Sequence, residues 1–262
     1  MSKKYKDSFG DRMKAYEAVS NYYLVKRMPV VIRLDGSHFH TFTKGFKKPF
    51  DDIMVTTMQE TMRNLCESIQ GCVLGYTQSD EITLVLCDYQ TLTTSAWFDN
   101  RLEKMCSIGG SMASRFFNRN FMLNIEKAKN QGEDVSVYER KIFTADFDCR
   151  VFNVPKEDVC NAVLWRQKDA EKNSVQALAQ SLFSHKELMG ISTKDLQDKM
   201  FTEKGVNWND YPTYLKRGSA CYKTVNDKGR SVWMIDLDMP ILSQHREYIE
   251  DRIYFETGDS NV

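Results

Sequence analysis

The order of strand-like and helix-like patterns between residues 30 and 154 constrains the fold of this chain most strongly. Short runs rich in β-branched and aromatic residues predict strands, and apolar residues that recur every three or four positions predict amphipathic helices. The expected elements are a strand at 30–35, a helix at 52–70, strands at 72–77 and 82–87, a helix from about 95 to 118, and a strand-like run at 141–147 that continues to 150–154. We therefore predict an α+β fold with a ferredoxin-type split βαββαβ core, whose antiparallel sheet carries both helices on one face.

The second part of the chain, residues 155–262, has a different pattern. Pro155 opens a long helical stretch that continues to Phe183, with a break expected near Asp169. A polar helix at 193–202 follows, and then a strand pair at 219–224 and 231–236 around a turn of the type that joins hairpins. We predict two regions: a catalytic core at 1–154, and a mostly helical C-terminal extension at 155–262 that packs on it.

Composition excludes several classes of protein. The 262 residues are 42% apolar and 27% charged, as in ordinary globular proteins, and no apolar run approaches the about 20 residues that a membrane span needs. The polar N-terminus lacks the apolar core of a signal peptide, so we expect a cytoplasmic protein with no membrane partner. Seven cysteines without paired CxxC spacing favour buried free thiols over a disulfide framework or a zinc site. Lys+Arg and Asp+Glu balance at 36 each, so any nucleic-acid contact must depend on local patches.

Acidic residues end one predicted strand and begin another. The apolar run from Val30 to Leu34 leads into Asp35 and Gly36, and Asp80 and Glu81 lie at the tip of the predicted hairpin. In the split topology the first and third strands are neighbours, so these acids are expected at the same sheet edge. Carboxylates beside an accessible carbonyl form the oxygen site that Mg²⁺ prefers, and two such ions serve phosphoryl or nucleotidyl transfer. The alternative is that both segments only form turns.

A basic loop follows the first predicted strand. Arg33 lies on the same side of that strand as Asp35, and Lys44, Lys47 and Lys48 follow in the loop. Together these cations could hold a triphosphate, although a solvated lysine loop is the simpler interpretation. His38 and His40 have too few neighbouring ligands for a metal site, so packing or substrate contact is expected of them.

Four motifs resemble one known family. They are RLDGSHFHTFTKGFKKPFDD at 33–52, YTQSDE at 76–81, WRQKDAEKN at 165–173 and YLKRG at 214–218. In this order they resemble the tRNA(His) guanylyltransferase family, and within it the bacterial guanylyltransferase-like members. The resemblance covers roughly residues 5 to 225 and implies a polymerase-palm-like fold. It also implies a Mg²⁺-dependent enzyme that adds nucleotides in the 3′–5′ direction to the 5′ end of tRNA. A 5′-monophosphate is first activated with ATP or GTP, and the 3′-hydroxyl of an incoming nucleoside triphosphate then attacks.

The resemblance also implies roles for individual residues. Asp35, Asp80 and Glu81 would be the catalytic acids. Asp35 and Asp80 would bind two Mg²⁺ ions with the Gly36 carbonyl, and Glu81 would support this site. The positions that match the nucleotide side of the family site are Arg33, Ser37, His38, Phe39, His40, Lys48, Asp51, Ser79, Arg101, Lys104 and Ser111. RNA contacts are implied for Arg150, Asn173, Lys216 and Arg217. The family also implies a homotetramer, to which the C-terminal extension could contribute contacts.

One departure from the family pattern affects the choice of RNA. Eukaryotic members carry a HINNLYN-type motif that goes with selection of the histidine tRNA, whereas this chain has EKNSVQA at 171–177 and keeps only Asn173. The favoured function is therefore templated repair of 5′-truncated tRNA. Addition of a single G to histidine tRNA is the nearest alternative. A palm-type nucleotide cyclase and a non-catalytic RNA-binding palm stay open as more distant ones.

Overall fold

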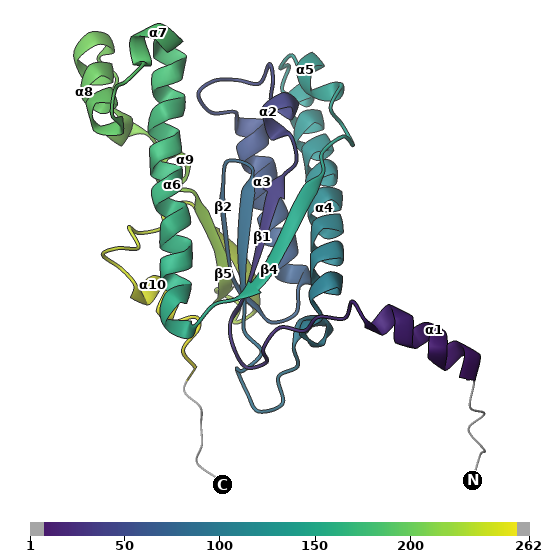
Figure 1. The fold of residues 1–262 in the computed structure, drawn as a ribbon. Coiled ribbons are helices and arrows are strands. Elements are labelled where there is room, and N and C mark those ends of the chain that lie inside the picture. Colours follow the sequence, from purple (N-terminus) through teal and green to yellow (C-terminus); the bar gives the residue numbers. More distant parts are fainter. Residues whose placement is uncertain (1–7, 256–262) are drawn as a thin grey trace.

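A six-stranded antiparallel sheet forms the centre of the computed structural model, which describes residues 8–255 (Figure 1). The strand order is β4-β1-β3-β2-β5-β6. The strands are β1 (Val30–Gly36), β2 (Cys72–Gln78), β3 (Glu81–Leu86), β4 (Phe147–Asn153), β5 (Ser219–Val225) and β6 (Ser231–Asp236). As the sequence predicted, the first and third strands are neighbours, and Asp35 lies directly opposite Glu81.

Helices cover both faces of this sheet. The helices α3 (Asp52–Ser68) and α4 (Leu102–Asn130) share one face, where β1 contributes Ile32 and Leu34 to the larger hydrophobic core. On the other face α6 (Lys156–Leu182) packs against β2, β3 and β5. The shorter elements are α1 (Ser8–Ala18), α2 (Phe39–Phe42), α5 (Ser136–Glu139), α7 (His185–Leu188), α8 (Thr193–Lys204), α9 (Thr213–Arg217), α10 (Glu247–Glu250) and the 3₁₀ turns η1 (Trp97–Asn100) and η2 (Trp208–Asp210).

The C-terminal region contributes to the same sheet as the N-terminal region. Its two strands, β5 and β6, are the predicted strand pair, and β5 pairs with β2. A third hydrophobic cluster joins the end of α6 to α8 and η2, with Leu178, Met200 and Trp208 in its interior. The extension therefore supplies strands as well as helices.

Three predicted boundaries are wrong, each for a local reason. Residues 141–144 form a turn, in which the Lys141 ammonium donates to the Thr41 carbonyl at 3.1 Å, and the strand begins only at Phe147. The second helix begins at Leu102 because Phe98 and neighbouring residues have positive φ, and it continues to Asn130. No break occurs near Asp169, because α6 is continuous there and the Asp169 carboxylate lies on the helix surface.

The described residues also bear on the cysteines and on membrane-spanning helices. All seven cysteines are free thiols, and five of them are buried. Within residues 8–255, none of the helices combines the length and the apolar character that a transmembrane helix requires.

Candidate active site

The end of β1 and the tip of the β2–β3 hairpin meet through the backbone. The Gly36 amide donates to the Asp80 carbonyl at 3.1 Å. A Cβ on Gly36 would lie 2.4 Å from the ring of Phe39, so only glycine allows this close packing. Phe39 itself is buried among aromatic side chains of the core. The glycine and the phenylalanine of the first motif thus fix Asp35 beside Asp80.

The two aspartates repel each other, and within residues 8–255 neither forms an ion pair. Burial raises the pKa of Asp35, and the charges of Asp80, Glu81 and Asp148 raise it further. Burial also raises the pKa of Asp80, whose carboxylate accepts a hydrogen bond from the Ser79 hydroxyl at 2.9 Å. Among residues 8–255, no side chain makes a hydrogen bond or ion pair with the Asp35 carboxylate, and no cation pairs with Asp80.

Glu81 lies at the same edge but has a different environment. Arg33 donates to its carboxylate from Nε at 2.7 Å, and Gln78 donates from its amide at 2.7 Å. Arg166, which is buried on α6, forms a second ion pair with Glu81 and also binds Asp169 at 2.8 Å. Glu81 is only 8% exposed, so this cluster clamps α6 onto the sheet. Arg33, one of the cations that the sequence analysis assigned to a triphosphate, therefore already has Glu81 as an internal partner.

Asp148 is an acid that the sequence analysis missed. It lies on β4 directly opposite Asp35 and pairs with Arg150 at 3.0 Å. The sequence pattern that could have identified Asp148 is the alternation of apolar and polar residues that begins at Phe147. The alternation can be recognised only if the strand is taken to begin at Phe147.

Within residues 8–255, the Asp35 and Asp80 carboxylates at this edge have no cationic partner. Glu81 has Arg33 and Arg166, and Asp148 has Arg150. Asp35 and Asp80 remain, beside the Gly36 backbone. Within the described part of the chain no cluster of three or more histidine, cysteine or acidic side chains is arranged to hold a metal. A Mg²⁺ ion, however, typically takes one or two carboxylates and completes its shell with water and phosphate, and this donor set fits that chemistry.

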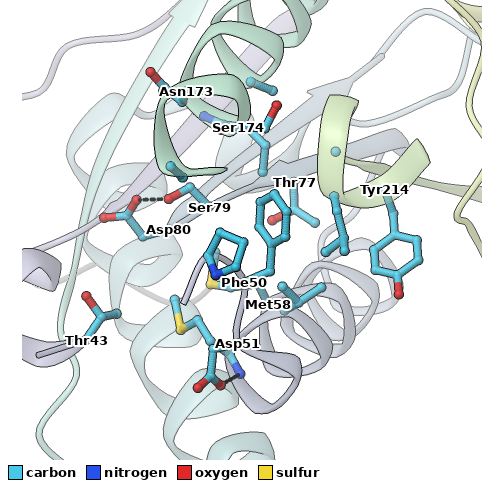
Figure 2. A pocket seen from close by; sticks show the side chains of 18 of the residues that line it. Thr43, Phe50, Asp51, Met58, Thr77, Ser79, Asp80, Asn173, Ser174 and Tyr214 are labelled. Atoms are coloured by element: carbon cyan, nitrogen blue, oxygen red, sulfur yellow. Dashed lines mark hydrogen bonds between the residues drawn. The ribbon is translucent and has the colours of Figure 1, made fainter. Parts of the chain in front are cut away.

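A cavity of about 430 Å³ opens beside Asp80 (Figure 2). It lies between the loop after α2, the start of α3, the hairpin tip, and the helices α6 and α9. The predicted site residues that line it are Phe39, His40, Lys48, Asp51, Ser79, Asp80 and Asn173. Phe50 and Tyr214, which were not predicted, also line it. The volume is in the range of small-molecule and cofactor sites.

The polar residues of the cavity differ in how strongly they are engaged. Asp51 caps α3 by accepting from the Met54 amide at 2.9 Å, and it also accepts from the Tyr138 hydroxyl. Lys47 pairs with Glu133 at 2.7 Å, whereas Lys48 has no ion pair within residues 8–255. The cavity therefore offers the ammonium of Lys48 to an anionic ligand.

Other predicted residues lie outside the cavity. Ser37 and His38 are exposed in the turn after β1, and Ser111 is exposed on α4. Arg101 and Lys104 lie near the start of α4. There the Arg101 backbone forms an isolated β-bridge with Tyr23, its guanidinium pairs with Glu103, and the neighbouring Asn100 donates to Asp88 beyond the end of β3. That is the opposite end of the sheet from Asp80, so the structure does not bring these two cations together with the acids.

The predicted RNA contacts have mixed environments. Arg150 is exposed on β4, and Asn173 lies at the cavity. Lys216 is buried and donates to the Asn209 carbonyl at 2.6 Å, and burial lowers its pKa. Arg217 pairs with Glu171 at 2.7 Å. The last two therefore hold α9 against its neighbours.

Comparisons with known proteins identify the family. The model of the tRNAHis guanylyltransferase family matches residues 10–155. The solved structure of a bacterial tRNA(His) guanylyltransferase-like protein in complex with ATP has a TM-score of 0.84 and 42% identity, covering 95% of this chain and 100% of that chain. A bacterial guanylyltransferase-like protein in complex with GTP follows with a TM-score of 0.79, 40% identity and the same coverage of 95% and 100%.

A eukaryotic relative agrees with this assignment. A probable tRNA(His) guanylyltransferase of Dictyostelium discoideum is 24% identical over 250 residues, which are 90% of this chain and 91% of the relative. The family match, which spans more than half of the chain, and the two bacterial structures lead to one conclusion: the chain belongs to the tRNA(His) guanylyltransferase family and is a nucleotidyltransferase.

Proposed function

We propose that this chain is a Mg²⁺-dependent 3′–5′ nucleotidyltransferase that extends the 5′ end of tRNA, with templated repair of 5′-truncated tRNA as its favoured reaction. The observation that supports this most directly is the pair of carboxylates without a cationic partner among residues 8–255, Asp35 and Asp80, of which Asp80 lines a cavity of about 430 Å³. The strand order β4-β1-β3-β2 supports a polymerase-palm-like split core that presents these acids at one edge.

The metal site would consist of the Asp35 and Asp80 carboxylates and the Gly36 carbonyl. Two bound Mg²⁺ ions would supply Lewis-acid activation of the attacking hydroxyl and stabilise the charge on the leaving pyrophosphate. The chain itself positions these ligands. A hydrogen bond between the Gly36 amide and the Asp80 carbonyl joins the two segments, and the ion pair of Glu81 with Arg166 fixes the hairpin that carries Asp80.

The cavity would receive ATP or GTP, the nucleotides present in the two bacterial relatives. Lys48, which has no ion pair within residues 8–255, would bind phosphate oxygens. Phe50 and Tyr214 supply aromatic surface for a base, and the hydroxyl of Ser79 lies next to the acids.

The choice of repair over single-G addition is supported by residues 171–177. In this stretch of α6, Glu171 pairs with Arg217, and the Ser174 hydroxyl accepts from the Trp208 indole at 3.0 Å. These side chains hold α9 and η2 in place, so they have internal roles where eukaryotic relatives carry the HINNLYN motif. A homotetramer and a cytoplasmic location stay predictions.

The test uses 5′-triphosphorylated, labelled tRNA that lacks its first nucleotide, with each nucleoside triphosphate in turn and Mg²⁺. We expect addition of only the nucleotide that pairs with the opposing base of the acceptor stem, and no addition by Asp80→Ala. A single G added to histidine tRNA, without extension of the truncated RNA, would establish the narrower reaction. Extension of neither RNA, with cyclic nucleotide formed instead, would overturn the proposal.

A further inference from the structure

Part of the sheet face that carries α6 is left open beside the acids. Along β4 the residues that point away from the core are Asp148, Arg150 and Phe152, and all three are exposed. The alternate residues of β4 face α4 instead. The register places Phe152 opposite Val31, and Arg150 opposite Arg33. An apolar ring therefore lies on the same face of the sheet as Asp35 and Asp148, four positions along β4 from Asp148.

A second exposed aromatic side chain borders this surface. Trp165 of α6 is 59% exposed, although tryptophan is usually well covered in a folded chain. Its ring lies 4.5 Å from the Arg166 guanidinium and 5.4 Å from that of Arg33. Because Glu81 fixes both arginines, the indole is held in place while much of its surface stays accessible.

Cations continue along the helix from this tryptophan. Lys168 and Lys172 follow Trp165 by three and seven positions, so they lie on the same side of α6. Both are exposed, and neither makes an ion pair within residues 8–255. Exposed aromatic rings beside unpaired cations are the combination with which proteins bind single nucleotides of a nucleic-acid strand.

From this arrangement we infer that Trp165 and Phe152 form a stacking platform for the nucleobase at the 5′ end of the RNA. The inference rests on the proposed function and names the surface that holds its RNA substrate. Lys168 and Lys172 contact the phosphates that follow. The cavity that Ser79 and Asp80 line receives the nucleoside triphosphate. Stacking accepts every base, which suits an enzyme whose choice of nucleotide comes from the template.

The inference can be tested by binding, without turnover. The probe is an acceptor-stem minihelix that lacks its first 5′ nucleotide and carries 2-aminopurine as its 5′-terminal base, with no nucleoside triphosphate present. Stacking on the wild-type protein should quench the 2-aminopurine fluorescence. We expect Trp165→Ala and Phe152→Ala each to weaken binding about 10-fold and to relieve the quenching. Trp165→Phe should keep most of the binding affinity and most of the quenching.

The matched control is Phe201→Ala, which removes a ring that is 61% exposed on α8, away from the acids. It should bind and quench as the wild type does. Because Trp165→Ala could disturb the arginine cluster, its thermal unfolding is measured in parallel, and Phe152→Ala tests the platform independently. Unchanged quenching and unchanged affinity in both alanine variants would overturn the inference. Extension of the unlabelled minihelix by the wild type tests the proposed function separately.

Discussion

Glu81 and the Asp35–Asp80 pair lie at one sheet edge and have opposite environments. Glu81 has two arginines and a glutamine around its carboxylate, and it is nearly inaccessible. The Asp35 carboxylate accepts no hydrogen bond within residues 8–255, and its pKa is raised by burial and by neighbouring acids. A carboxylate that is removed from water requires cations or hydrogen-bond donors around it. The chain supplies both for Glu81, whereas within residues 8–255 it supplies no ion-pair partner for Asp35 or Asp80. Glu81 therefore stabilises the fold, whereas Asp35 and Asp80 are available to bind a cationic ligand.

The largest expected effect comes from removing a charge of the unmatched pair. Asp35→Asn should lower the rate of RNA extension by about 10³-fold, because several kcal/mol of charge stabilisation depend on the metal ligands. Its stability without divalent ions should be unchanged or higher, since the substitution relieves repulsion from Asp80. The measurements are single-turnover extension and thermal unfolding.

The control for this variant is Asp227→Asn, which neutralises an exposed acid in the turn between β5 and β6. It should leave both quantities at wild-type values. An Asp35→Asn protein that unfolds much more easily than the wild type would contradict the view that this carboxylate is uncompensated.

Neutralising the clamped acid should have its main effect on stability. Glu81→Gln leaves the buried Arg166 without its main partner, and breaking a buried ion pair costs about 3 kcal/mol of unfolding free energy. The measurement is equilibrium unfolding in urea. Glu133→Gln, which breaks the exposed pair with Lys47, is the control and should cost less than about 1 kcal/mol. If Glu81→Gln were as stable as the wild type yet as inactive as Asp35→Asn, Glu81 would act directly on the substrate or metal.

Much of this comparison was predictable from the sequence, and the reasons for the rest are physical. The β-branched run before Asp35 and the spacing of the hairpin predicted that the acids meet. The clamp was not predictable, because Arg166 is 85 positions from Glu81 and only the packing of α6 on the sheet unites them. Asp148 was missed because the strand was expected to begin at 141, which hides its alternation.

The residues carried over from the family show the same limit. Lys48 and His40 follow the acids closely in sequence, and the structure places both at the cavity. Arg101 and Lys104 are separated from the acids by the length of β3, because α4 begins at the far end of the sheet. Sequence proximity to Asp35 was not sufficient, because Ser37 and His38 lie outside the cavity. Of the family positions on the two long helices, Asn173 of α6 reaches the cavity, whereas Lys104 of α4 does not.

The smallest expected effect concerns Mg²⁺ and pH, and it tests the pair without any RNA. The folded-state pKa of Asp35 and of Asp80 is raised from 3.8, so the folded protein binds more protons than the unfolded chain between 3.8 and the raised values. In the absence of metal, the stability that these two groups contribute should therefore be lost as the pH rises through that window. At neutral pH, Mg²⁺ at ten times its Kd should restore about 1.4 kcal/mol, and this gain should shrink as the pH falls into the window. This gain in stability is measured by thermal unfolding in the presence of Mg²⁺, compared with unfolding in NaCl of equal ionic strength. A gain that persists in Asp35→Asn would place the ion elsewhere and would remove the distinction between the clamped and the unmatched acids.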